Sequence, residues 1–204
     1  LKNIFNNVLM LGHRTFFLVR EIRRLFLARM TAPKRHLPTE QTTLLISSIS
    51  YRSIHLADDF HSFFFGDLVD QLTKLGHRIA LVPIIQRGVN YKQALLGLHD
   101  SPTPVMVPYQ YVRFFDILKA AVSSIRPIPV PRSIASFSGM DIGLLVNEEI
   151  TDYRYTNWAA DSMLVLAMVK RWSDMGISLD RMIYIYENQP WERALCFGAR
   201  QYFP

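Results

Sequence analysis

Residues 42–85 decide the fold and read TTLLISSISYRSIHLADDFHSFFFGDLVDQLTKLGHRIALVPII. Residues 42–50 predict a buried strand, because apolar side chains fill most of a short run. The next segment keeps the 3.6-residue period of an amphipathic helix, with apolar residues Phe60, Phe64, Leu68, Leu72 and Leu75. Gly76 is placed to end that helix, and residues 77–85 form a second apolar strand. This order is the opening unit of a Rossmann-like, doubly wound α/β domain with a mostly parallel sheet.

The same alternation continues toward the carboxyl end. The patterns predict helices at 91–99, 111–125 and 156–174, a short strand at 105–107 and an extended proline-rich segment at 126–132. Gly176 follows the last of these helices, and residues 182–186 predict one more buried strand. Pro190 is placed to open a final helix, since proline is favoured in the first helical turn. We therefore expect a helix and linker over residues 1–38 and one α/β domain over residues 39–204.

The amino-terminal segment is strongly basic. Lysine or arginine occupies positions 2, 14, 20, 23, 24, 29, 34 and 35, against the single acid Glu21. Leu18, Ile22, Leu25 and Phe26 recur at helical spacing, with the arginines largely on the other side. Such a helix is typical of a segment at an anionic membrane surface, here through residues 14–29, but also of a surface helix packed on protein. No uninterrupted apolar stretch reaches the ~18–20 residues that span a bilayer.

Composition narrows the function classes. The formal net charge of +6 is concentrated in the amino-terminal segment, whereas a nucleic-acid reader carries basic side chains across its folded face, so we expect no nucleic-acid partner. The single cysteine, Cys196, excludes a disulfide framework and fits a reducing compartment. The sequence contains no GxGxxG loop, P-loop, HExxH or GxSxG pattern. We therefore expect neither a bound metal nor a resident cofactor.

Polar residues follow three predicted strands, at the edge where open α/β sheets bind ligands. They are Ser50, Tyr51 and Arg52, then Gln86 and Arg87, and then Glu187, Asn188 and Gln189. Backbone amides at helix starts, with Arg52 or Arg87, can hold an anion. Glu187 or Asp141 can deprotonate a hydroxyl as a general base. The alternative is structural, with these charges solvating loops and with Glu187 and Glu192 capping the last helix.

Residues 184–193 read YIYENQPWER, and they carry a family resemblance together with residues 137–142 and 47–65. The chain resembles bacterial surface-polysaccharide biosynthesis proteins, which are glycosyltransferase-like and have the two-Rossmann-domain architecture called GT-B. Their pattern is aromatic-x-Glu-Asn-x-Pro-Trp-Glu-Lys/Arg after a buried strand. It is matched by Glu187, Asn188, Pro190, Trp191, Glu192 and Arg193. The resemblance covers about residues 42–204 and is most specific in this last strand–helix unit.

The resemblance implies the acceptor-side domain of a glycosyltransferase in O-antigen or capsule synthesis. A nucleotide-sugar would be the co-substrate, and a glycan or lipid-linked molecule the acceptor, at the cytoplasmic face of the plasma membrane. Glu187 would be the base, with Asp141 as a second candidate and with Asn188 and Glu192 positioning the site. From their positions after the strands, rather than from the resemblance, we expect substrate contacts from Ser50, Tyr51, Arg52, Arg87 and Gln189. A second Rossmann domain would follow Pro204, which makes the chain the first part of a longer protein.

Two other function classes remain open. One is a sugar-nucleotide epimerase, which shares the two-domain architecture. The other is a non-catalytic scaffold at the membrane in polysaccharide synthesis, which would place no chemical demand on residues 187–192.

Overall fold

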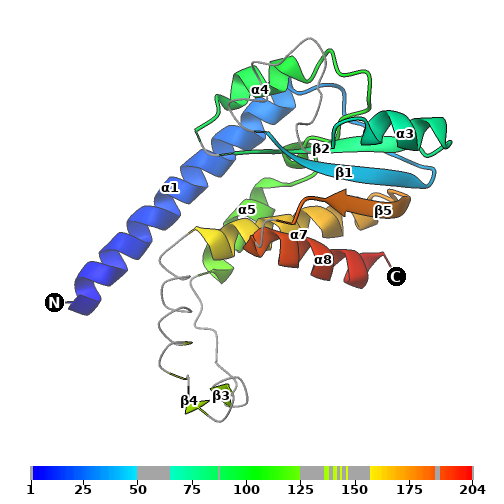
Figure 1. Ribbon diagram of the computed structural model, residues 1–204. Coiled ribbons are helices and arrows are strands. Elements are labelled where there is room, and N and C mark those ends of the chain that lie inside the picture. Colours follow the sequence, from blue (N-terminus) through cyan, green and yellow to red (C-terminus); the bar gives the residue numbers. More distant parts are fainter. Residues whose placement is uncertain are drawn as a thin grey trace.

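The computed structural model describes residues 2–49, 65–86, 88–124, 136–137, 140–141, 143, 146, 157–186 and 189–203 (Figure 1). The helices are α1 (Lys2–Thr31), α3 (Leu68–Lys74), α4 (Tyr91–Gly97), α5 (Phe114–Ser123), α7 (Trp158–Asp174) and α8 (Pro190–Tyr202), with a short 3₁₀ helix, η1 (Pro108–Gln110). The strands are β1 (Thr42–Ile49), β2 (Ile79–Ile85), β3 (Ser136–Phe137), β4 (Met140–Asp141) and β5 (Leu179–Tyr184).

A three-stranded parallel sheet forms the centre, in the order β2-β1-β5. Leu45 of β1 is in register with Leu81 of β2 on one side and with Ile183 of β5 on the other. The chain thus adds one neighbour to each edge of β1, which produces a topological switch point at the carboxyl end of that strand.

Helices cover both faces of the sheet. The apolar side chains of β1 point alternately to the two faces, so they contribute to two separate cores. Leu44 and Ile46 join the core formed with α5, α7 and α8, where Trp172 is fully buried. Leu45 and Ile49 join the other core, which contains Leu95 of α4 and the carboxyl-terminal part of α1. The prediction of an open, mostly parallel α/β sheet is confirmed at this level.

Three residues predicted to mark helix ends are confirmed. Gly76 (φ +82°) follows α3 and Gly176 (φ +71°) follows α7, and both adopt the left-handed conformation that favours glycine. Pro190 opens α8 and Glu192 lies in its first turn.

Several predicted boundaries were wrong. The last strand is Leu179–Tyr184 rather than residues 182–186, and the helix predicted at 111–125 begins only at Phe114. A 3₁₀ turn that starts at Pro108 precedes that helix and delays its start. The strand predicted at 105–107 is reduced to one bridge between Val105 and Leu81.

Helix α1 packs against α4, α5 and η1 and extends past them at its amino end (Figure 1). Its inner side buries Phe17, Glu21, Leu25 and Ala28. Phe26, which the sequence places on the apolar side of this helix, is 63% exposed. None of the helices in the described residues is long and apolar enough to cross a membrane.

Candidate functional site

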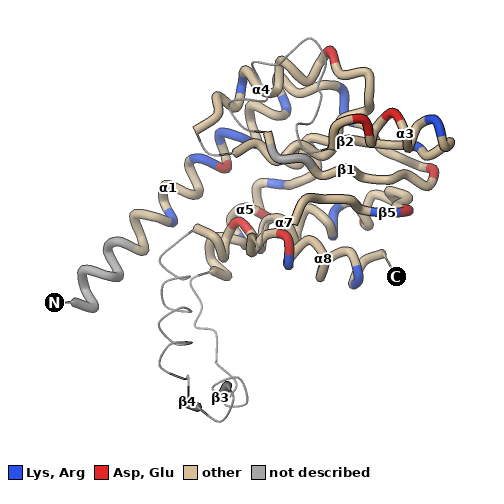
Figure 2. The backbone as a smooth tube through the Cα atoms, viewed as in Figure 1, with Lys and Arg blue, Asp and Glu red and all other residues tan. Residues whose placement is uncertain are grey.

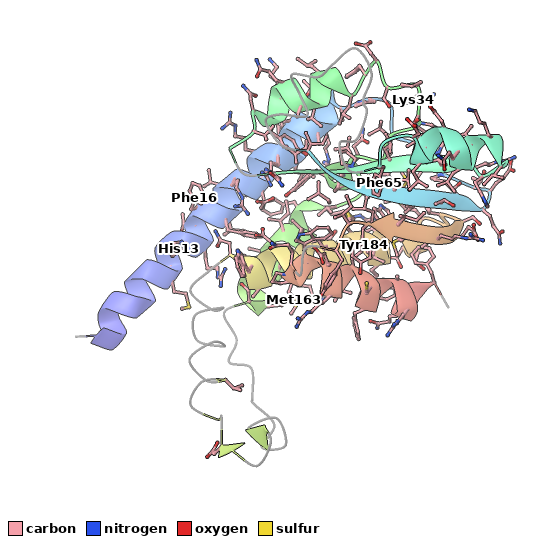
Figure 3. All side chains as sticks on the ribbon, viewed as in Figure 1. His13, Phe16, Lys34, Phe65, Met163 and Tyr184 are labelled. Carbon is pink, nitrogen blue, oxygen red and sulfur yellow. The ribbon has the colours of Figure 1, made fainter. Side chains whose placement is uncertain are left out.

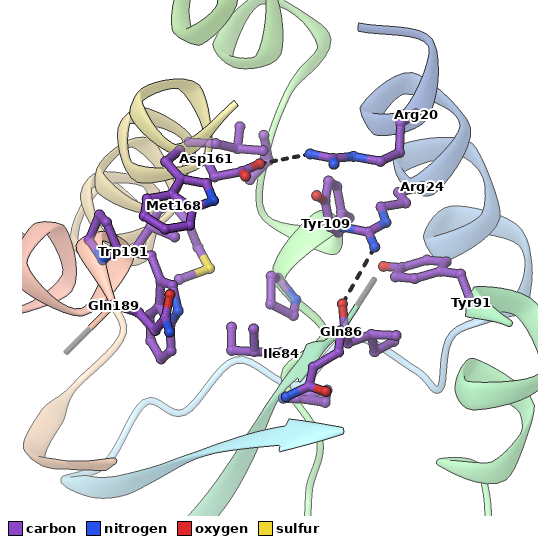
Figure 4. A pocket seen from close by; sticks show the side chains of 18 residues that line it. Arg20, Arg24, Ile84, Gln86, Tyr91, Tyr109, Asp161, Met168, Gln189 and Trp191 are labelled. Carbon is purple, nitrogen blue, oxygen red and sulfur yellow. Dashed lines mark hydrogen bonds and ion pairs between the residues drawn. The ribbon is translucent and has the colours of Figure 1, made fainter. Parts of the chain in front are cut away.

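A cleft of about 450 Å³ lies at the carboxyl edge of the sheet, beside the switch point (Figure 4). Its floor is the end of β2, from Pro83 to Gln86, and its walls come from α1, α4 and η1 on one side and from α7 and the start of α8 on the other. The volume falls within the ~300–1,000 Å³ typical of small-molecule sites.

A larger cavity of about 650 Å³ lies at the opposite edge of the sheet, near the first residues of β1 and β2. Its lining includes His36, Asp70 and Arg78. Parallel α/β sheets bind ligands at the carboxyl edge, so the smaller cleft is the candidate site.

An ion pair joins the two walls of the cleft. Arg20 Nη2 of α1 donates to Asp161 Oδ1 of α7 at 2.8 Å, and Figure 4 shows the two side chains meeting across the opening. Arg24, one turn further along α1, donates from Nη2 to the carbonyl oxygen of Ile85 at 3.4 Å. Its guanidinium carbon also lies 5.2 Å from the centre of the Tyr91 ring. These contacts fix two cations at the rim of the sheet.

Glu21 supports both arginines from beneath. It accepts hydrogen bonds from Arg20 Nε and from the Tyr109 hydroxyl, and Arg24 Nη1 lies 3.8 Å from its carboxylate. The side chain is fully buried, and this burial raises the pKa of Glu21, although Arg24 and Arg20 act in the opposite direction. Glu21 therefore fixes the position of Arg20, Arg24 and Tyr109 rather than facing a ligand.

Aromatic rings form much of the remaining wall. Tyr91 and Tyr109 meet edge to face, with ring centres 5.8 Å apart. Burial raises the pKa of Tyr91 well above its usual range, so its hydroxyl stays protonated at neutral pH. Trp158 and Trp191 lie on the α7 and α8 side, and Trp158 is 45% exposed. Flat apolar faces thus adjoin the polar groups Gln86, Asp161 and Gln189.

Two of the predicted strand-end residues are brought together at this edge. Gln86 and Gln189, which follow β2 and β5, both line the cleft, as the shared strand edge predicts. Glu192 does not line the cleft and is buried, 1% exposed, in the first turn of α8. Six predicted residues lie outside the described part of the chain: Ser50, Tyr51, Arg52, Arg87, Glu187 and Asn188.

Asp141 does not line the cleft. It is exposed on β4, in a two-stranded ribbon with β3 that Figure 1 draws apart from the sheet, and its Oδ1 accepts from the Gly143 amide at 2.8 Å. Its assignment as a second base remains a prediction.

Sequence reasoning missed the residues that α1 and α7 bring to the cleft. The sequence groups Arg20 and Arg24 with the basic side of α1 and gives them no place in the site, but their side chains are only 14% and 17% exposed and face the cleft. Asp161 and Trp158 lie in the helix predicted at 156–174, and no motif marks either of them as a site residue. A single acid, Glu21, in an otherwise basic helix was the available signal for an inward-facing charge cluster.

Among the described residues, no group of three or more His, Cys, Asp or Glu side chains is placed to hold a metal ion. Comparison with known proteins gave no match to a family model, a curated protein or a solved structure.

Proposed function

We propose that the chain is the acceptor-side part of a glycosyltransferase, and that its cleft binds a sugar unit of a glycan or lipid-linked acceptor. The observation that carries the proposal is the composition of the cleft wall, where tryptophan and tyrosine rings adjoin amide, carboxylate and guanidinium groups at the carboxyl edge of a parallel sheet.

A sugar ring presents C–H groups on its faces and hydroxyl groups around its edge. Trp158 and Trp191 offer apolar faces for the former. Asp161, Gln86 and Gln189 offer acceptors and donors for the latter. Arg20, which also lines the cleft, adds a guanidinium group with N–H donors.

Transfer needs a base for the acceptor hydroxyl. As the base removes the proton, the hydroxyl oxygen attacks the anomeric carbon of the donor, the bond from that carbon to the phosphate oxygen breaks, and the nucleoside diphosphate leaves. Gln189 lies on the cleft wall, two positions after Glu187 in the chain. The resemblance assigns Glu187 as the base, with Asn188 and Glu192 beside it.

Acceptor binding is tested with methyl glycosides and intrinsic fluorescence. Of the three tryptophans, Trp158 and Trp191 line the cleft, whereas Trp172 is buried in the core. We expect a saturable fluorescence change with at least one of methyl glucoside, galactoside and N-acetylglucosaminide. Trp191→Ala should weaken that binding about tenfold, equivalent to about 1.4 kcal/mol.

Phe197→Ala is the matched control, because this residue lies on the same helix, is 60% exposed and does not line the cleft. A response to none of the three sugars, or equal weakening in both variants, would reject a sugar site in this cleft.

The base is tested in the whole encoded protein, with a labelled nucleotide-sugar and a bound acceptor. Glu187→Gln should slow transfer by about 10²–10⁴-fold, the usual contribution of general base catalysis, while acceptor binding and the unfolding midpoint stay unchanged. Wild-type transfer in the variant would remove Glu187 as the base. Conversion of the nucleotide-sugar itself, without an acceptor, would identify an epimerase instead.

A further inference from the structure

The outer side of α1 carries a continuous apolar stripe. Its members are Leu11, Phe16, Val19, Ile22, Phe26 and Met30, each between 37% and 66% exposed. From Phe16 to Met30 they recur three or four positions apart, and Leu11 lies five positions before Phe16, which puts them on one side of the helix. Phe17, Leu25 and Ala28 face the opposite way and are buried against the domain. The domain therefore packs without the stripe.

Basic residues accompany this apolar stripe. Arg23 and Arg29 are exposed on the same helix, and Lys34 and Arg35 are exposed just beyond it. The single acid before Glu40 is Glu21, and it is fully buried on the inner side. Figure 2 shows this excess of basic positions along α1. The outward surface of α1 thus combines apolar and positive groups.

We propose that this outer stripe binds an anionic lipid bilayer, with α1 lying along the membrane surface. Apolar side chains enter the boundary between headgroups and acyl chains, while arginines beside them extend to the lipid phosphates. The inference rests on α1 alone and is independent of the sugar site.

The geometry favours a bilayer over other occupants. A single straight helix presents a convex ridge, which suits a broad surface, and its amino-terminal part, where Figure 3 labels His13 and Phe16, extends past the domain. A second copy of the chain would bring two basic surfaces together with no exposed acid of α1 to pair with them.

Vesicle flotation tests the proposal. The probes are vesicles of phosphatidylcholine alone and vesicles with an equal share of phosphatidylglycerol. The chain should float with the anionic vesicles and much less with the neutral ones. Phe16→Ser/Val19→Ser/Phe26→Ser should abolish flotation. Arg23→Gln/Arg29→Gln should weaken it about fivefold for each arginine, the equivalent of about 1 kcal/mol per charge near an anionic surface.

Matched controls use exposed residues elsewhere. Leu75→Ser/Phe197→Ser removes two apolar side chains that are as exposed as those of the stripe, and Lys74→Gln/Arg181→Gln removes the same charge as the arginine variant. Both should float as the wild type does, and thermal unfolding should confirm that every variant is folded.

Three results would overturn the proposal: no flotation of the wild type, equal losses in the controls and the stripe variants, or sedimentation showing that the stripe instead holds two copies of the chain together.

Discussion

The inner and outer sides of α1 carry similar residue types but have different partners. On the inner side, Arg14 is 2% exposed and donates to Asn157 Oδ1 at 3.2 Å, and Arg20 donates to Asp161. On the outer side, Arg23 and Arg29 are exposed among apolar side chains. The inner arginines have partners on or just before α7, more than a hundred positions away in the chain.

This difference shows that net charge is a poor measure of the surface available to a partner. The inner arginines hold α1 to the domain and shape a cleft, so they do not act as surface cations. A bilayer or another anionic surface meets only the outer ones. The functional assignment of a basic helix therefore depends on which of its sides faces the domain. Successive side chains point about 100° apart around the helix axis, so neighbouring residues can face opposite surroundings.

Two neighbouring phenylalanines give the largest expected contrast between the sides. Phe17 is fully buried and Phe16 is 62% exposed. Phe17→Ala should lower the free energy of unfolding by about 3–5 kcal/mol, because it removes a large ring from a packed core. Phe16→Ala should change it by no more than about 0.5 kcal/mol. Urea unfolding followed by circular dichroism measures both, and similar losses in the two variants would contradict the assigned rotation of α1.

Local patterns were sufficient for two of the strands and for three helix ends. The apolar runs at Leu44–Ile46 and Ile79–Ile85 predicted buried strands, and both strands lie in the described sheet. Gly76, Gly176 and Pro190 marked ends that depend only on backbone preference. The shared strand edge also predicted that Gln86 and Gln189 belong to one site.

The cleft residues that the sequence did not predict, on α1 and α7, are brought to the site by long-range packing. Whether Arg20 faces solvent or a cleft is decided by Asp161, and no local pattern connects two residues 141 positions apart. The apolar periodicity of α1 was ambiguous for the same reason, because apolar residues occupy both its inner and outer sides. Sequence period alone indicates an apolar side but not whether protein covers it.

The charge cluster on the inner side of α1 consists of Glu21, Arg20 and Arg24. We expect it to have a smaller effect, which is a change of the free energy of unfolding with pH. Burial raises the pKa of Glu21 against the pull of Arg24 and Arg20. A group whose pKa is raised on folding contributes its full stabilisation at pH values below its unfolded-state pKa, which is ~4.3 for glutamate. This contribution is lost as the pH rises through the folded-state pKa. Because glutamine does not titrate, the stability of the wild type relative to Glu21→Gln should fall as pH rises.

Asp116 on α5 is the matched control with the opposite sign. Desolvation acts to raise the pKa of Asp116, but hydrogen bonds from Arg171 and from the Arg113 backbone lower it overall. The stability that the wild type has relative to Asp116→Asn should therefore be present at neutral pH and be lost as pH falls. Urea unfolding across the acidic range, up to neutral pH, measures both slopes. A Glu21 contribution that grows with pH would show that its arginine partners outweigh its burial.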